Sequence, residues 1–119
     1  MLDGEAIKTV LIAEDDIIVG MDLRDQFTEA GYAVQGPFST AAAAIAASQA
    51  AAPDFAVLDY QLKDGTAEAL AQSLAAGEIP YIVVSVTSER QISPAVQPIG
   101  FFDKPFDIAG LSNLMKTRI

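Results

Sequence analysis

The sequence predicts an α/β fold built on a doubly wound, five-stranded parallel sheet. Short apolar runs of strand length alternate along the chain with segments of helical periodicity, which is the pattern of βαβ units. The run Phe55–Leu58 is apolar throughout, as expected of a central strand covered on both faces. A chain of 119 residues has room for one such domain, so we expect residues 1–119 to form a single unit. The expected strand order is 2-1-3-4-5, and ligands bind outside the carboxyl ends of strands one and three.

The first half of the chain predicts two strands and two helices. A strand over Thr9–Ala13 precedes a helix over about Ile17–Ala30, which Gly31 ends. The apolar residues of this helix recur at core-facing spacing: Val19, Leu23, Phe27 and Ala30. A second strand, Ala33–Phe38, is followed by an alanine-rich helix over Ala41–Ala51. Alanine has the best helix propensity, Ser39 or Thr40 can cap this helix, and Ile45 is its main side chain for burial.

The second half continues the alternation with one irregular crossover. The turn signal Asp64-Gly65 follows the third strand and precedes a helix over Thr66–Ala76. A fourth strand covers Tyr81–Val84, and a minimal fifth strand covers Gly100–Asp103. Between them stand two prolines, so the fourth helix should be short or degenerate, within Ser88–Ser93. A last helix should begin near Asp107 and bury the stripe Ile108, Leu111, Leu114 and Met115.

The composition excludes several classes of function. Sixteen acidic residues against seven basic ones give a net charge of −9, which argues against nucleic-acid binding. The absence of cysteine excludes disulfides and zinc–thiolate sites, and the absence of histidine excludes histidine-based acid–base catalysis and a role as histidine phosphodonor. No apolar run is long enough for a membrane span, and the first residues lack the basic region of a signal peptide. We therefore expect a cytoplasmic protein with no membrane partner.

Four chemically active residues each fall at the end of a predicted strand: Asp15, Asp59, Ser85 and Lys104. Because the carboxyl ends of parallel strands meet at one edge of a sheet, we expect these side chains to share one crevice. Carboxylates that lie close together repel one another unless a cation joins them. Oxygen ligands of this kind suit Mg²⁺, which can also neutralise a phosphoryl group.

With these residues in this order, the chain from about Lys8 to Met115 resembles a response regulator receiver domain, the phosphoacceptor of two-component signalling. The resemblance implies a flavodoxin-like receiver fold and a phosphoacceptor at Asp59. It implies Mg²⁺ held by Asp15 directly, by Glu14 through water, by Asp59 and by the backbone carbonyl of Gln61. Asp16, beside this acidic pair, is expected instead to complement the start of the first helix.

The same resemblance assigns the switch residues and the partners. Lys104 would neutralise a phosphoryl oxygen, with a cis bond to Pro105, and Ser85 and Phe101 would be the switch residues. The chain would accept a phosphoryl group from a sensor histidine kinase or a histidine phosphotransfer protein and change a surface near strands four and five. It would be no enzyme beyond catalysing its own aspartyl phosphorylation and dephosphorylation. The downstream partner is unknown, and homodimer formation stays open.

Two departures from the family pattern keep other readings open. The loop Tyr60–Asp64 is shorter than usual, and Val86 stands where the family prefers alanine or glycine. The short loop and reduced fourth helix are similar to a subgroup of single-domain receivers. The alternative is a receiver-like binding module that is not phosphorylated. A flavin-nucleotide carrier is disfavoured because the acidic run after the first strand would repel a phosphate, and an aspartate-nucleophile phosphatase would need a second aspartate where Gln61 stands.

Overall fold

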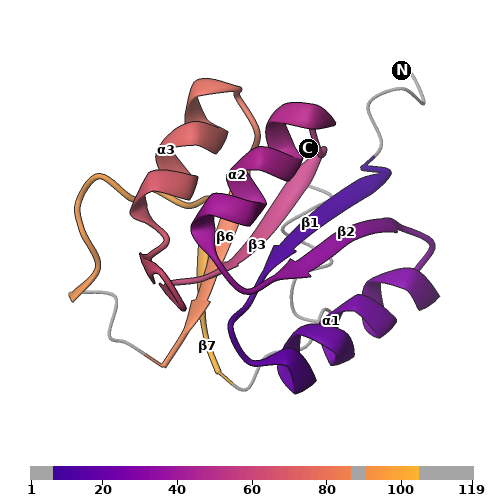
Figure 1. The fold of residues 1–119 in the computed structure, drawn as a ribbon. Coiled ribbons are helices and arrows are strands. Elements are labelled where there is room, and N and C mark those ends of the chain that lie inside the picture. The colour runs from indigo at the N-terminus through magenta and orange to yellow at the C-terminus, as the bar shows by residue number, and fades with distance from the viewer. Residues whose placement is uncertain (1–6, 87–90, 105–119) are drawn as a thin grey trace.

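The centre of the molecule is a five-stranded parallel sheet (Figure 1). The computed structural model describes residues 7–86 and 91–104. In spatial order the strands are β2 (Ala33–Phe38), β1 (Thr9–Ala13), β3 (Phe55–Asp59), β6 (Tyr81–Ser85) and β7 (Gly100–Asp103). All four neighbouring pairs are parallel. Since β6 and β7 are the fourth and fifth strands of this sheet along the chain, the predicted order 2-1-3-4-5 is confirmed.

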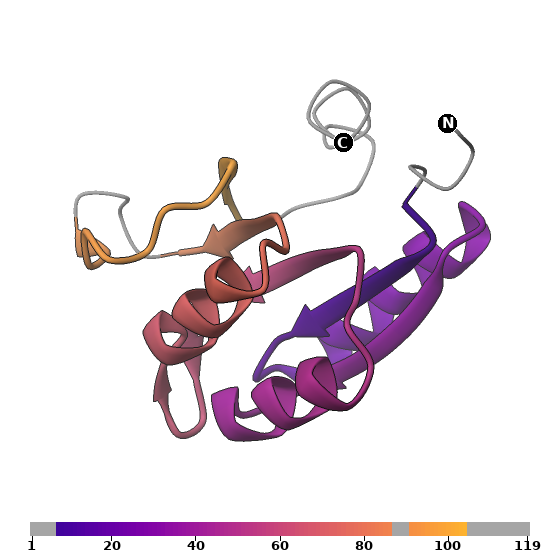
Figure 2. The ribbon, with the colours of Figure 1, turned by 90° about the horizontal axis from the view of Figure 1, so that it is seen from above.

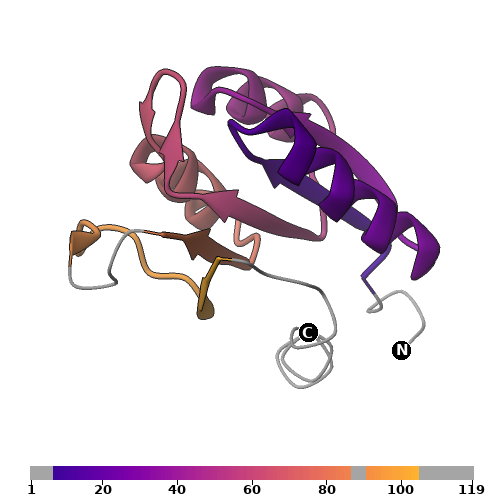
Figure 3. The ribbon, with the colours of Figure 1, turned by 90° about the horizontal axis from the view of Figure 1, so that it is seen from below.

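Helices cover both faces of the sheet. The helices α2 (Ala41–Ala50) and α3 (Glu68–Ala76) lie together on one face (Figure 2). The helix α1 (Ile17–Glu29) lies on the opposite face, against β1 and β2 (Figure 3). Because parallel strands need crossover connections that pack on a face of the sheet, the alternating sequence pattern gives a doubly wound fold.

The apolar residues of the strands alternate between two cores, as the period of two residues in a strand requires. On the face of α2 and α3, Leu11, Leu58 and Val83 are fully buried. On the face of α1, Ile12, Val57 and Ile82 are equally buried, together with Leu23 and Phe27 of that helix. The central strands β3 and β6 are buried at every position, and for β3 this confirms the prediction made from its continuous apolar run.

The start and end of α1 follow from local chemistry. The side chain of Asp16 accepts the N–H groups of Ile18 and Val19 at 3.0 and 3.3 Å, so Asp16 is the N-cap of the helix. Its negative charge at the start of the helix was predicted, whereas the cap itself was not. Gly31, just beyond the helix, has a φ of 102°, a conformation that favours glycine. The predicted stripe holds for Leu23 and Phe27, which are buried, and for Val19, which is half-buried and packs against the same core. Ala30 is exposed because the helix ends at Glu29.

The alanine-rich segment forms α2, and Thr40 is its N-cap, with the hydroxyl oxygen accepting the N–H of Ala43 at 3.1 Å. The buried face of α2 consists of small side chains, and Ile45, predicted as the main buried residue, is half-buried. Small residues let two helices approach closely, and α2 packs directly beside α3 on the sheet.

The segment after β3 contains a small antiparallel hairpin that the sequence did not predict. It pairs β4 (Gln61–Leu62) with β5 (Gly65–Thr66), and Gly65 has a φ of 131° at its turn. The helix predicted from Thr66 therefore begins later, at Glu68, because the backbone of Thr66 is engaged in the hairpin.

Three expectations fall wholly or partly outside the described residues: the short helix over Ser88–Ser93, the last helix near Asp107, and the cis bond between Lys104 and Pro105. Residues 91–99 of the crossover contain no α-helix, in agreement with the effect of the two prolines. No helix among the described residues combines the length and apolar character required to cross a bilayer.

Candidate functional site

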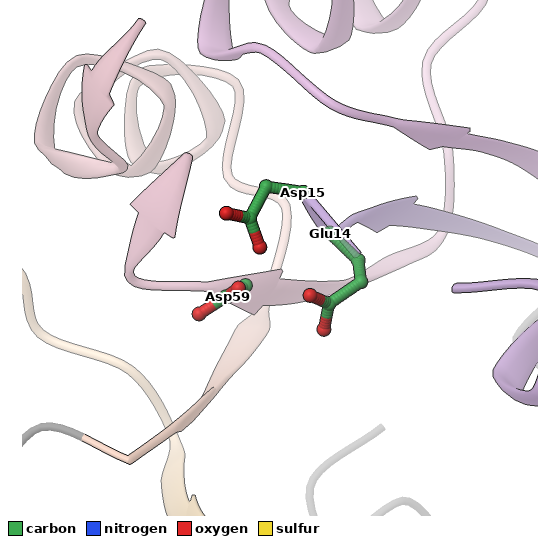
Figure 4. A group of neighbouring side chains, drawn as sticks. All are labelled: Glu14, Asp15 and Asp59. Carbon is green, nitrogen blue, oxygen red and sulfur yellow. The ribbon is translucent and has the colours of Figure 1, made fainter. Parts of the chain in front are cut away.

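Three carboxylates converge at the carboxyl ends of β1 and β3. The two strands are neighbours, with Ala13 opposite Leu58, so Glu14 and Asp15 leave β1 beside Asp59 at the end of β3. Oxygen atoms of the three carboxylates lie within 4.8 Å of one another, and their side chains point into the same space (Figure 4). The predicted acidic cluster is therefore present, at the predicted edge of the sheet.

Lys104 joins this cluster from the far side of the sheet. It follows β7, which is separated from β3 by β6. Its Nζ lies 3.0 Å from Glu14 Oε1 and 3.1 Å from Asp59 Oδ2. The expectation that Lys104 and Asp59 share one crevice is confirmed. One ammonium thus contacts two of the three carboxylates and offsets part of their repulsion.

Burial makes the charge on Asp59 costly. The side chains of Glu14 and Asp59 are only 2 and 6% exposed. Burial, together with the Glu14 carboxylate beside it, raises the pKa of Asp59 to about 7, and the Lys104 ammonium works against this rise. Burial would lower the pKa of Lys104, but the hydrogen bonds and charges of Glu14 and Asp59 outweigh it and raise that pKa. The lysine therefore stays charged while Asp59 is held close to its titration point at neutral pH.

The acidic pair is fixed by the backbone around it. The N–H of Glu14 donates to the carbonyl of Phe38 at 2.8 Å, which ties the end of β1 to the end of β2. Glu14 Oε2 accepts the N–H of Asp16 at 3.1 Å, so the carboxylate turns back over the start of α1. Asp15 is half-buried and reaches the same space from the other side. The possible metal ligands of this cluster are carboxylate oxygen atoms, which suit Mg²⁺.

The remaining predicted site residues lie at the positions that their strands dictate. Ser85 is buried at the end of β6, one residue after Val84, which pairs with Asp59 of β3. The carbonyl of Ser85 accepts the N–H of Lys104 at 3.2 Å. The N–H of Gln61 donates to Asp59 Oδ1 at 3.3 Å, while its side chain is exposed. Phe101 of β7 lies opposite Val83 of β6 and is half-buried against the core on the face of α2 and α3.

Two tyrosines, one beside the site and one at the opposite end of β6, were not recognised as functional candidates in the sequence. Tyr60 follows Asp59 directly, is buried, and its hydroxyl oxygen accepts the N–H of Ser93 at 3.2 Å. The hydroxyl of Tyr81 accepts the N–H of Gln97 at 2.8 Å, and burial raises the pKa of this tyrosine. Both hydroxyls hold the crossover between β6 and β7. The sequence offered only a weak signal: an aromatic residue after an aspartate usually fills a core.

Exposed apolar side chains border the site. Ile17, Ile18 and Met21 project from the start of α1, and Val86 is 83% exposed just after β6. A groove of about 580 Å³ lies between α1 and the end of β6, with Lys104 at its wall. Val86, which we identified as a departure from the family pattern, thus lines the approach to the cluster.

Sequence comparison finds distant relatives. No family model matches the chain. The transcriptional regulatory protein PdtaR of Mycobacterium tuberculosis, in strains H37Rv and CDC 1551 / Oshkosh, is 27% identical over 113 residues, which are 92% of this chain and 55% of that protein. The chain therefore spans about half the length of the curated relatives that it matches.

Comparison with solved structures identifies the fold. The signal receiver domain of a modulated diguanylate cyclase from Desulfovibrio desulfuricans G20 has a TM-score of 0.82 and 28% identity, covering 93% of this chain and 92% of that one. The receiver domain of the sensor histidine kinase PA1611 from Pseudomonas aeruginosa PAO1, solved with a magnesium ion in its active site cleft, has a TM-score of 0.81 at 17% identity, covering 94% and 97%. The chemotaxis response regulator CheY4 of Vibrio cholerae has a TM-score of 0.79 at 18% identity, covering 96% and 100%.

These neighbours and the cluster at the end of β3 define the class of the protein. The chain has the CheY-like fold of response regulator receiver domains. That fold supports a phosphoacceptor role in two-component signalling, as the sequence predicted.

Proposed function

We propose that this chain is the phosphoacceptor receiver of a two-component phosphorelay and that Asp59 carries the phosphoryl group. The observation that carries the proposal is the Asp59 carboxylate itself, 6% exposed, next to two further carboxylates and 3.1 Å from the Lys104 ammonium. An isolated structural aspartate has no need of such surroundings. A carboxylate that must attack phosphorus next to a cation does need them.

In the proposed reaction, an oxygen of Asp59 attacks the phosphorus of a phosphohistidine. A P–O bond forms, the P–N bond breaks, and the imidazole of the donor leaves. Lys104 neutralises one phosphoryl oxygen, and the Ser85 hydroxyl donates to another. In dephosphorylation, water would attack the phosphorus, the bond to the Asp59 oxygen would break, and inorganic phosphate would leave the free carboxylate behind. In this proposal the chain catalyses its own phosphorylation and dephosphorylation and no other reaction.

The acidic cluster fits a divalent cation. Glu14, Asp15 and Asp59, with the backbone carbonyl of Gln61, would hold Mg²⁺, which when bound offsets the charge of the carboxylates and of the phosphoryl group. The magnesium ion in the cleft of the neighbouring receiver from Pseudomonas aeruginosa supports this assignment.

We further propose that the phosphoryl donor is a sensor histidine kinase or a histidine phosphotransfer protein. Next to the cluster, exposed apolar side chains offer such a phosphoryl donor a surface to bind: Ile17, Ile18 and Met21. The response would be a changed surface near β6 and β7, because Ser85 ends β6 and Lys104 follows β7. A downstream protein would read this surface.

The test is phosphoryl uptake by the intact protein. With Mg²⁺ and a small-molecule phosphodonor, mass spectrometry should show one added phosphoryl group on the wild type and none on Asp59→Asn. Asp54→Asn is the matched control, since Asp54 lies at the other end of β3 and should leave labelling unchanged. Equal labelling of Asp59→Asn would place the acceptor elsewhere. Absence of labelling in the wild type, also with histidine phosphodonors, would favour a binding module that works without phosphorylation.

A further inference from the structure

Asp64 links the loop that carries the site to a distant helix. Its Oδ1 accepts the N–H of Ala41 at 2.8 Å, and its Oδ2 accepts the N–H of Ala42 at 3.1 Å. These are the first two residues of α2, whose third N–H is already satisfied by Thr40. The carboxylate therefore completes the start of a helix that lies more than 20 residues away in sequence.

A second contact fixes the same side of the loop. The N–H of Lys63 donates to the carbonyl of Ser39 at 2.9 Å. The turn between β4 and β5 is thus held to the start of α2 by three hydrogen bonds, two of them to a charged acceptor. The pKa of Asp64 is lowered by its hydrogen bonds with the backbone of Ala41 and Ala42, as expected for a carboxylate that is stabilised in its ionised form.

The other side of the loop is fixed to the phosphoacceptor. The N–H of Gln61 donates to Asp59 Oδ1, and the N–H of Ala67 donates to the carbonyl of Tyr60 at 2.8 Å. Gln61 pairs with Thr66 across the hairpin. Gln61, whose carbonyl is the remaining proposed magnesium ligand, therefore lies between Asp59 and the part of the hairpin that Asp64 anchors.

We propose that Asp64 is a positioning residue for magnesium binding: by fixing the hairpin to the start of α2, it places the backbone of Gln61 relative to Asp59. The proposal rests on the function proposed above. Mg²⁺ requires near-ideal octahedral geometry, so a loosely held ligand weakens its binding strongly. The carboxylate of Asp64 supplies an anchor within the short loop that follows Asp59.

The chain contains a matched control for this role. Asp54 also accepts two consecutive backbone N–H groups, those of Lys8 and Thr9, both at 2.9 Å. It does so at the opposite end of the sheet from the cluster. Thr40 provides a second control, because Thr40→Ala removes a cap of α2 without touching the hairpin.

The experiment is a magnesium titration of the unphosphorylated protein, followed by calorimetry or by amide chemical shifts. Loss of a residue that orients a metal ligand typically weakens binding by roughly 10- to 100-fold, so Asp64→Ala should weaken it by about tenfold, while Asp54→Ala and Thr40→Ala stay within about twofold of the wild type. Asp64→Asn, which keeps one acceptor oxygen, should lie between Asp64→Ala and the wild type. Urea unfolding of each variant separates the effect on binding from the effect on stability.

Three results would overturn the inference. If Asp64→Ala binds Mg²⁺ as tightly as the wild type, Asp64 has no positioning role, and the proposed function is unaffected. Equal weakening in Asp64→Ala and Thr40→Ala would assign the effect to the stability of α2 instead. If the wild type itself binds no Mg²⁺, the proposed function falls, and this inference falls with it.

Discussion

Replacing Asp59 by asparagine should stabilise the metal-free protein at alkaline pH, although the change removes a contact with Lys104. In the folded protein, burial and the Glu14 carboxylate raise the pKa of Asp59 to about 7, whereas an aspartate in the unfolded chain has a pKa of about 4. Between these two values the folded state keeps a proton that the unfolded state has released. The contribution of Asp59 to stability is therefore full below about pH 4 and is lost as the pH rises through about 7.

The size of the effect follows from this shift. A difference of roughly three pH units corresponds to about 4 kcal/mol, because each unit is equivalent to about 1.4 kcal/mol. Solvent at the edge of the sheet screens the charge and lets it relax, so we expect about 1 to 2 kcal/mol in practice. Asparagine has nearly the shape of a protonated aspartate but no charge. The variant should thus be more stable than the wild type by this amount at about pH 8, and by less at about pH 5.

The assay is urea unfolding followed by circular dichroism, with a chelator present, at several pH values for both proteins. Equal slopes against urea would show that the two proteins expose the same surface. For a domain of this size, 1 kcal/mol corresponds to a shift of about 4 °C in the unfolding midpoint. Added Mg²⁺ should stabilise the wild type and leave the variant unchanged. If the variant is no more stable than the wild type at any pH, attraction to Lys104 outweighs burial and the reasoning is refuted.

Three further substitutions test the coupling and the packing of the site. Lys104→Ala should still fold, because this side chain is not part of either apolar core, although the change removes the ammonium that the buried Glu14 and Asp59 carboxylates contact. Phosphorylation of this variant should no longer alter amide exchange between β6 and β7; an exchange response equal to that of the wild type would contradict the role of Lys104. Tyr60→Phe removes the acceptor of the Ser93 N–H and should lower the free energy of unfolding by about 1 kcal/mol. Amide exchange should become faster at Ser93 than at Gln97, because the N–H of Gln97 donates to Tyr81 instead. Gly20→Ala would place a Cβ 2.6 and 2.8 Å from Pro37 Cβ and Cγ and should destabilise the protein by about 1 to 3 kcal/mol, whereas Gly77→Ala meets only ordinary contacts from 3.6 Å and serves as the control.

The sequence alone determined the strands of the parallel sheet, the helices between residues 17 and 76, and the edge of the sheet where the site lies. Continuous apolar runs such as Phe55–Leu58 identify central strands, because both of their faces must be covered. Since Asp15, Asp59, Ser85 and Lys104 each follow such a run, the parallel topology brings them to one edge without further information. Local signals also identified Asp16 as a charge at the start of the first helix and the glycine beyond its end.

Tertiary structure decided which of these groups touch and what holds them. The contact of Lys104 with both Glu14 and Asp59 depends on the register of four strands, and no local pattern encodes it. The sequence marked Asp64 only as a turn residue; its two bonds to the start of α2 arise because the hairpin and that helix meet in space. For the same reason the third helix begins at Glu68 instead of Thr66. Periodicity reports which face of an element is buried, whereas contacts between distant polar groups depend on how the finished layers align.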